Sequence, residues 1–526
     1  MKFSAIKAKL PALSNSLLAI FSAILLILAF PDFEFWFLAC IALIPLLFAL
    51  EREKESFAKS FITGWIFGVT FFTGTCWWLT FAPITYGGVP APLAYLLLLG
   101  ATSVVGLFPA LFGGLLSLIL KRFGTWGILS APFLWTAIEF LRFWTTGNNW
   151  NAIAYSQAFL PVYANFASIG GIYLTNFLLV SISATFCNEL VRKFYGQKIP
   201  FLAWIISFFA VFLPIFLFQF AQAELKQKDE IVNIIAIQPN VPMSGLNFQE
   251  WKRLRERHVQ LAERELSKLK DNPKSEIPIP KSIIIFPESP MNFGWTQDHE
   301  FQEFLQDFTQ KHNVQVLFNA AEPSEKRTYF NSAVLVNEEG KKIAQYDKIH
   351  LVPFGEYVPL PEPFASLMPT MVGNFEIGQE YDIVPLGEAK AGIMICFESH
   401  FPTLSRQFAL NGADVLVEMT NDGYLGPTPI LRQHLANAVF RAVETNRPVL
   451  RVTNVGITAY IDERGQVIEP SKPYTEDTRV WTVSKSDGSQ TFYVKYGDWF
   501  AWLCSFVSLV LLFVGFWRKK LSKIEK

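Results

Sequence analysis

Three segments of the sequence end on residues that could act on a carbonyl carbon. Glu288 closes the apolar stretch SIIIFPE, Lys348 follows the strand-like run KKIAQYD, and Cys396 closes GIMIC. A thiol has a pKa of about 8.5, so forming its thiolate at neutral pH requires a nearby base. A carboxylate can be that base, and a fixed ammonium group with the backbone N–H after the cysteine can stabilise an oxyanion. If the three segments meet at one edge of a sheet, they would form a nucleophilic centre.

Each of these residues also has an ordinary structural interpretation. A glutamate at a strand–proline turn is most often a solvated loop acid. Lys348 beside Asp347 could form a surface ion pair that contributes little to stability. Cys396 after an apolar strand could be an inert core thiol. Taken singly, none of the three residues is specific, and both interpretations stay open at this point.

The histidines offer no better base or ligand set. His350 lies close to Pro353 and Gly355, which mark a tight segment, and we interpret it as structural rather than catalytic. The other histidines show no metal-ligand spacing, the sequence has no Gly-rich phosphate loop, and the net charge is zero without a basic patch. Nothing in these patterns indicates a metal, a nucleotide cofactor or a nucleic-acid partner.

The composition is typical of a membrane protein with a soluble part. Hydrophobic residues make up 51% of the 526 residues, and charged residues only 17%, whereas soluble domains have about 25% charged residues. All cysteines except Cys396 lie in or beside apolar runs, where cysteine is usually a small buried hydrophobe. This placement argues against a disulfide framework.

Apolar stretches dominate the first part of the chain and recur near its end. A membrane-spanning helix needs about 20 mostly apolar residues. About eight stretches meet this requirement: 13–30, 35–50, 61–82, 92–120, 125–143, 164–187, 200–220 and 498–517. The first is not a good signal peptide, because it lacks a small-residue cleavage site and further spans follow.

The connections between these stretches alternate in charge. Lysine and arginine occur at the N-terminus and at 51–60, 121–122, 191–198 and 517–526, and are absent from the intervening connections. The positive-inside rule therefore predicts that both termini are cytoplasmic and that the long polar segment faces outward. The expected domains are transmembrane helices one to seven (1–222), an extracytoplasmic domain (223–495), and a last helix with a basic tail (496–526).

The polar segment is long enough for a complete domain. Apolar, strand-like runs alternate in it with helical patterns, which predicts a layered α/β or α+β core. The expected strands are 231–238, 282–288, 314–320, 331–337, 390–398, 413–421 and 449–461. The expected helices are 247–270, 299–312 and 429–446.

Three motifs make the domain recognisable. FPES, YDKIHLVPFGEYVP and GIMICFES resemble the three signature segments of the nitrilase superfamily, whose members use a Glu-Lys-Cys triad. Placed between apolar spans and facing outward, such a domain resembles the bacterial apolipoprotein N-acyltransferase family. The segments PFLWTAIEFLR (132–142) and NNWNAIAYSQ (148–157) are also similar to that family's membrane motifs. The resemblance implies an α-helical membrane domain joined to an αββα layered sandwich.

By position, the resemblance implies roles for six residues. Glu288 matches the general base, Lys348 the oxyanion-stabilising lysine and Cys396 the nucleophile. Glu356 matches a further essential glutamate. Phe397 and Glu398 match supporting active-site positions, although the family more often has tyrosine where this chain has Phe397. No cofactor and no metal are implied.

The resemblance also implies a reaction and its partners. The family transfers an acyl chain from a phospholipid, through a thioester acyl-enzyme, to the N-terminal amine of diacylglyceryl-cysteine in an apolipoprotein. We expect a multi-pass, monomeric protein of the bacterial inner membrane with its catalytic domain in the periplasm. Alternatives are a membrane-tethered nitrilase-type amidase and, from another class, a transporter or scaffold. The paired broken helices or internal repeats of transporters are not apparent in the sequence.

Two further features have open interpretations. Residues 366–380 carry apolar side chains between glycines and could be a mobile lid over acyl chains or an ordinary packed loop. Glu139 and Arg142 lie near the end of the fifth stretch. Charge within a membrane suggests function, but an i,i+3 ion pair is the simpler interpretation.

Overall fold

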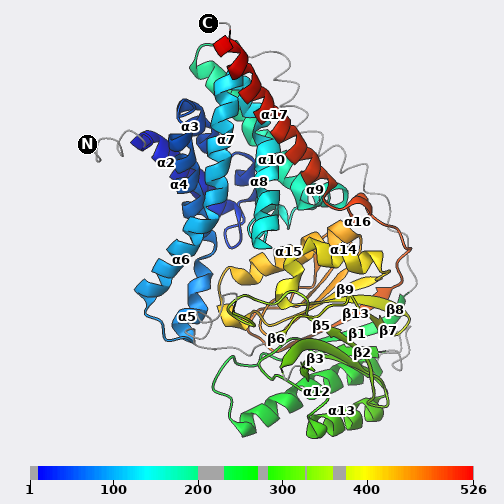
Figure 1. Ribbon diagram of the computed structural model, residues 1–526. Coiled ribbons are helices and arrows are strands. Elements are labelled where there is room, and N and C mark those ends of the chain that lie inside the picture. The colour runs from blue at the N-terminus through cyan, green and yellow to red at the C-terminus, as the bar shows by residue number, and fades with distance from the viewer. Residues whose placement is uncertain (1–9, 199–229, 271–281, 326–327, 359–374, 525–526) are drawn as a thin grey trace. The chain divides into compact units, whose positions relative to one another are not determined.

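The computed structural model describes residues 10–198, 230–270, 282–325, 328–358 and 375–524. The chain forms two compact units (Figure 1). One, the helical unit, contains residues 1–224 and 496–526, and the other, the catalytic unit, contains residues 225–495.

The regular secondary structure described in the helical unit is entirely helical. They are α2 (Leu13–Ala29), η1 (Trp36–Cys40), α3 (Ile44–Arg52), α4 (Phe57–Thr75), η2 (Trp77–Thr80), α5 (Phe81–Thr85), α6 (Ala91–Val105), α7 (Leu107–Phe123), η3 (Gly124–Ser130), α8 (Ala131–Thr146), η4 (Ile153–Gln157), α9 (Pro161–Ala164), α10 (Ala167–Phe194) and α17 (Trp499–Ile524). Glycines allow α4 and α7 to approach closely: a Cβ at Gly64 would lie 2.2 Å from Pro109 O. Small residues have this role in many membrane helix pairs.

The predicted spans match the helical unit only in part. Among the described residues, three helical segments are long and apolar enough to cross a membrane, and a bent pair, α4 with η2 and α5, makes up to four. One of the three, Ala91–Thr146, has 56 residues and covers two predicted spans. The predicted span 200–220 lies outside the described residues. The number eight therefore remains a prediction.

Two predicted spans are interrupted where the sequence pattern showed continuous apolar runs. Residues 35–50 do not form one helix, because the chain turns between η1 and α3, with Pro45 in the first turn of α3. Residues 61–82 bend by 62° between Thr75 and Trp77. Hydropathy records how apolar a segment is and does not record where its helix breaks.

The catalytic unit contains two mixed sheets and the helices that cover them. The strands are β1 (Glu230–Gln238), β2 (Ser282–Ile285), β3 (Gln315–Pro323), β4 (Tyr329–Val336), β5 (Lys342–Asp347), β6 (Phe375–Glu376), β7 (Ile383–Leu386), β8 (Ala389–Ile395), β9 (Val415–Thr420), β10 (Val449–Thr453), β11 (Ala459–Ile461), β12 (Val467–Ile468) and β13 (Asp477–Ser484). The helices are α12 (Phe248–Lys270), α13 (His299–His312), η7 (Cys396–His400), α14 (Pro402–Leu410), η8 (Asp422–Leu425), α15 (Ile430–Thr445) and, at the boundary of the units, α16 (Phe492–Tyr496).

The first sheet has the order β13-β1-β2-β3-β4-β5, with β6 paired to β4, and the second has the order β12-β11-β10-β9-β8-β7. Strands β1, β2 and β3 are parallel, as are β8, β9 and β10. The segment 449–461, predicted as one strand, is instead two antiparallel strands, β10 and β11.

Helices cover the outer face of each sheet, as Figure 1 shows. Helices α12 and α13 bury Leu254, Leu266, Phe301 and Leu305 in one core with apolar residues of β1 to β4. Helices α14 and α15 pack against the second sheet, and the two sheets contact each other through β1 with β10 and β4 with β8. The expected αββα layered sandwich is confirmed.

Candidate active site

The three candidate catalytic residues follow strands that end at the same edge of the sandwich. Glu288 follows β2, Lys348 follows β5 directly, and Cys396 is the first residue of η7 after β8. Strand β5 is antiparallel to β4, which is antiparallel to β3, so β2 and β5 run in the same direction. The carboxyl ends of these strands therefore bring residues from distant parts of the sequence together.

The structure places the carboxylate, the amine and the thiol in one cluster. Glu288 and Cys396 lie close enough to influence each other's pKa, and Lys348 Nζ lies 3.9 Å from Glu288 Oε1. The lysine side chain is only 1% exposed, whereas the cysteine is half-buried. A surface ion pair and a sealed core thiol are thus both inconsistent with the geometry.

Glu356 holds the lysine from the other side. Lys348 Nζ lies 2.9 Å from both carboxylate oxygens of Glu356. The backbone N–H of Val352 donates to Glu356 Oε2 over 2.7 Å. The Glu356 carboxylate therefore fixes the Lys348 ammonium group. It also closes the turn between Val352 and Glu356.

Asn331, in β4, is a part of the site that the sequence analysis missed. Its Nδ2 donates to Glu288 Oε1 over 3.0 Å and to Glu356 Oε1 over 2.6 Å. One amide thus sets the spacing between the two carboxylates. The available signal was a buried asparagine in a mostly apolar strand, since buried polar groups need partners.

Glu398 connects the lysine segment to the cysteine segment. Its Oε1 accepts hydrogen bonds from the hydroxyl of Tyr346 and from the backbone N–H groups of Ile349 and His350. Its Oε2 accepts one from the N–H of Ile395. Burial raises the pKa of this carboxyl to about 7, although these donors act in the opposite direction. Glu398 is therefore a structural tie between the two sheets.

The charges of the cluster influence one another. Burial raises the pKa of Glu288; the charge of Lys348 opposes this, and that of Glu356 adds to it. Burial also raises the pKa of the Cys396 thiol, with a further increase from Glu288. Burial disfavours the charged form of Lys348, but Glu356 and Glu288 outweigh it and raise the lysine pKa. The resting site thus holds a thiol, a charged lysine and a carboxyl that binds a proton more readily than usual.

Comparison with known proteins extends over both units. Residues 22–185 match the apolipoprotein N-acyltransferase N-terminal domain, and residues 248–492 match the carbon-nitrogen hydrolase domain. Apolipoprotein N-acyltransferase of Geobacter metallireducens is 30% identical over 516 residues, covering 96% of each chain. The chain belongs to the apolipoprotein N-acyltransferase family.

Other relatives agree with this assignment. Apolipoprotein N-acyltransferase 1 of Treponema denticola is 29% identical, covering 95% of each chain. The Vibrio cholerae apolipoprotein N-acyltransferase is 26% identical over 97% of this chain and 98% of its own length. Among solved structures, Saccharomyces cerevisiae Nit3 of the nitrilase superfamily matches 50% of this chain and 93% of its own, with 16% identity and a TM-score of 0.36.

Phe397, a predicted supporting residue, and His350, predicted to be structural, both contact aromatic rings. The Phe397 ring lies 5.0 Å from that of His400 and 5.3 Å from that of Phe401, measured between centroids. His350 stacks on Phe401, with ring centroids 3.8 Å apart and planes at 7°. Burial, and then the charge of Lys348, lower the pKa of His350 to about 4. These contacts are those of a packed ring, as the structural interpretation of His350 expects.

The end of the predicted lid segment contacts the backbone of the site. Residues 366–374 lie outside the described residues, so the lid remains a prediction. Beyond them, Phe375 N donates to Glu356 O, and Gly378 N donates to Lys348 O over 2.8 Å. A Cβ at position 378 would lie 2.0 Å from Asp347 O, so only glycine fits this close approach.

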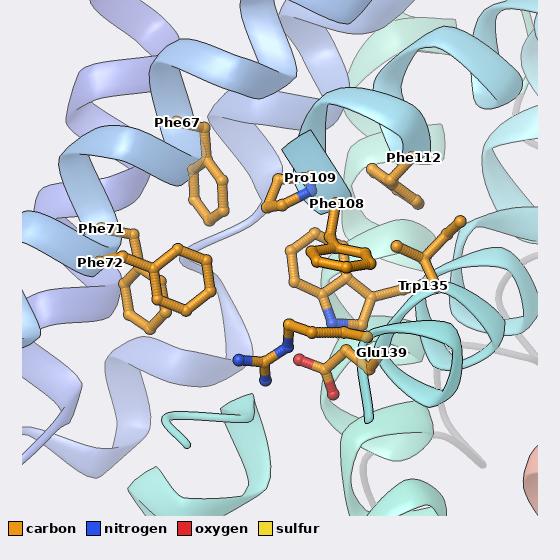
Figure 2. Close-up of a pocket in the computed structure, with 10 residues that line it drawn as sticks. Phe67, Phe71, Phe72, Phe108, Pro109, Phe112, Trp135 and Glu139 are labelled. Carbon is orange, nitrogen blue, oxygen red and sulfur yellow. The ribbon is translucent and has the colours of Figure 1, made fainter. Parts of the chain in front are cut away.

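Glu139 and Arg142 belong to the helical unit. They line a pocket with aromatic residues of α4, α7 and α8 (Figure 2). Glu139 accepts a hydrogen bond from Asn176, and Arg142 Nη1 donates to Trp150 O over 2.8 Å. Both charged residues therefore contact other segments of the unit.

Proposed function

We propose that this chain transfers an acyl chain from a phospholipid to the N-terminal amine of a diacylglyceryl-cysteine apolipoprotein, through a thioester on Cys396. The observation that supports this most directly is the meeting of Glu288, Lys348 and Cys396 at one end of the sandwich. We take the two substrate classes, a phospholipid as acyl donor and an apolipoprotein as acceptor, from the family to which the chain belongs.

In the first half-reaction, the ester carbonyl of the phospholipid is attacked by sulfur. Glu288 takes the thiol proton as Cys396 forms a bond to the carbonyl carbon. Lys348 and the backbone N–H of Phe397 stabilise the resulting oxyanion. As the intermediate collapses, the ester C–O bond breaks and Glu288 returns the proton to the departing oxygen. A lysophospholipid leaves, and a thioester remains.

In the second half-reaction, the lipoprotein amine attacks the thioester, where a hydrolase would use water. The neutral amine attacks the thioester carbonyl, and the same donors stabilise the second oxyanion. Glu288 accepts a proton from the attacking nitrogen while the C–S bond breaks, and it then returns that proton to the sulfur. The products are an amide and the free thiol, so the enzyme is restored.

The raised pKa of the thiol gives Glu288 its importance in this scheme. A resting thiolate is not favoured, because burial raises the pKa of Cys396. Proton removal must then accompany attack on the carbonyl, and Glu288, which interacts electrostatically with Cys396, is the group that accepts the proton. Asn331 and Glu356 act as positioning residues, since both hold other members of the cluster.

The arrangement in the membrane is part of the same proposal. Alternating charge of the connections supports cytoplasmic termini and a catalytic unit on the periplasmic side. We also propose a monomer with domain boundaries near 222 and 495. Reporter fusions at the connections 121–122 and 148–157 test the topology: a periplasm-dependent reporter should be active only at the second position.

The reaction is tested by the intact mass of the purified full-length protein in detergent. Incubation with phospholipid should add one acyl chain to the peptide containing Cys396, and hydroxylamine should remove it. A diacylglyceryl-cysteine peptide should then take up the chain as an amide. Release of free fatty acid or ammonia without any acylated peptide would instead support the amidase alternative, which the comparisons do not favour over acyl transfer.

A further inference from the structure

A buried histidine contacts the backbone of the candidate nucleophile. His434 lies in α15 and is 4% exposed. Its Nε2 lies 3.0 Å from the carbonyl oxygen of Cys396, and its Nδ1 lies 2.7 Å from Asp422 Oδ1. The histidine thus connects the first residue of η7 to a carboxylate in η8.

The partners determine the protonation of the ring. A carbonyl oxygen can only accept a hydrogen bond, and the same is true of an ionised carboxylate. Both ring nitrogens must therefore carry hydrogen for both contacts to form, so His434 is an imidazolium. The pKa of His434 agrees: Glu418 and Asp422 raise it to about 9 against the opposing effects of burial and Arg451.

The contact to Cys396 also fixes the amide that follows it. The peptide unit of Cys396 and Phe397 is planar, and its C=O and N–H point in opposite directions when it is trans. A donor that holds the carbonyl oxygen therefore sets the direction of the Phe397 N–H. Cys396 has a φ of 52°. Residues other than glycine rarely adopt this backbone conformation, so the surrounding contacts must maintain it.

We infer that His434 is a positioning residue: by donating to the carbonyl of Cys396, it aims the Phe397 N–H at the oxyanion formed during acylation. This inference rests on the proposed function, because it assigns a purpose to the N–H that stabilises the oxyanion. His434 itself does not touch the reacting atoms.

A rigid set of charges holds the histidine in place. Asp422 also contacts Arg451 Nη2 at 2.7 Å, and Arg451 Nη1 lies 2.5 Å from Glu418 Oε1. Glu418 Oε1 in turn lies 3.0 Å from His434 Nε2. The carboxylates and the guanidinium of this set are buried, so a rotation of the imidazole would leave charges without partners, which is costly.

The alternative is that His434 only stabilises the fold. Two variants separate the interpretations, because each keeps one of the two contacts. His434→Gln can place an amide donor near the position of Nε2 and keep the bond to the Cys396 carbonyl. His434→Asn reaches only as far as Nδ1, so it can satisfy Asp422 but not the carbonyl.

The test compares two reactions of Cys396 in the full-length protein in detergent. Acylation by phospholipid, measured in a single turnover, forms an oxyanion. Alkylation by iodoacetamide uses the same thiol without forming one. We expect His434→Asn to slow acylation roughly ten- to hundredfold, with alkylation within about threefold of wild type. His434→Gln should retain most of the acylation rate.

Equal losses of acylation in the two variants, or a parallel loss of alkylation, would overturn the inference. If His434→Asn does not fold, the wild-type protein supplies a second measurement. Its ratio of acylation to alkylation rates should fall as the pH rises through about 9, because neutral His434 that still donates to Asp422 can no longer donate to the carbonyl. A flat ratio would contradict the inference, whereas a wild-type protein that is alkylated but never acylated would contradict the proposed function.

Discussion

Two buried charged clusters of the catalytic unit, the reaction cluster and the cluster around His434, differ in how their charges balance. In the reaction cluster, Glu288 and Glu356 share the single ammonium group of Lys348. One carboxylate therefore lacks a full counter-charge, and burial raises the pKa of Glu288. A group in this state is ready to accept a proton.

The neighbouring cluster contains two cations and two carboxylates. Arg451 and His434 lie within 3.0 Å of Glu418 and Asp422, so each charge has a partner. Arg451 lowers the pKa of Asp422 to about 2 in spite of burial. An excess of one charge thus permits proton transfer, whereas a balanced set of charges maintains geometry.

The largest effect should come from removing the sulfur. Cys396→Ala should reduce acyl transfer by about 10⁴-fold or more, since losing a nucleophile removes the covalent route. The measurement is transfer of labelled acyl chain to a diacylglyceryl-cysteine peptide. Cys40→Ala, at the half-buried thiol of η1, is the matched control and should remain active. If Cys396→Ala were still labelled covalently by the acyl chain, Cys396 could not be the nucleophile.

Removing the negative charge of Glu288, which has no full counter-charge, should have the next largest effect. Glu288→Gln keeps the shape of the side chain but cannot accept the thiol proton, so we expect acylation to fall by about 10² to 10⁴-fold. The rate of thioester formation in a single turnover measures it. If the rate were unchanged, another group would have to act as the base.

In the balanced cluster, removing a charge should affect stability. Arg451→Met leaves Glu418 and Asp422 without their guanidinium, and we expect a loss of about 3–5 kcal/mol in the free energy of unfolding. Denaturant unfolding followed by tryptophan fluorescence measures it. Arg479→Met, at a partly exposed pair with Asp477, should cost only about 0–1 kcal/mol. Similar losses in both variants would contradict the distinction.

The balanced cluster should also make stability depend on pH. His434 has a pKa raised from 6.5 to about 9, so its contribution is complete below pH 6.5 and is lost as the pH rises through 9. The loss should be on the order of 3 kcal/mol. The groups that face His434 are Glu418, Asp422, Arg451 and the ring of His400, whose centroid lies 5.8 Å from that of His434. Unfolding at several pH values should show this decline in the wild type and not in His434→Gln.

The smallest effect should come from the amide between the two acids. Asn331→Ala removes hydrogen bonds to Glu288 and Glu356 without removing a charge, and we expect acylation to slow by about 10- to 100-fold. Asn337→Ala, in the turn after β4, is the control because its Oδ1 accepts only from nearby backbone N–H groups. A normal rate in Asn331→Ala would show that the acids hold their spacing without it.

The sequence was sufficient to predict the strands that carry the site, because buried parallel strands are continuous apolar runs. Glu288 and Cys396 each follow such a run, whereas Lys348 follows β5, a mostly half-buried or exposed strand antiparallel to β4. Asn331 and His434 could not be found in the same way. Asn331 lies within its strand, and Glu288 lies 43 residues away from it. His434 lies in a helix that is buried on nearly all sides, so no polar face marks its position.

The helical unit was harder to predict for a different reason. Hydropathy identifies apolar length, but helix breaks depend on backbone conformation. Gly171, for example, has a φ of 63° inside α10, and the chain bends near Thr75 without any interruption in its apolar character. The boundaries of spans were therefore less well predicted than those of strands.

The four hydrogen bonds accepted by Glu398 have a consequence for folding. Each sheet can form its own strand pairs before the two sheets are docked, but the amine and the sulfur belong to different sheets. Glu398 helps to fix their separation, because its carboxylate bridges Ile349 and Ile395. Mild denaturation that loosens the sandwich should therefore abolish turnover while most of the helical and strand content survives.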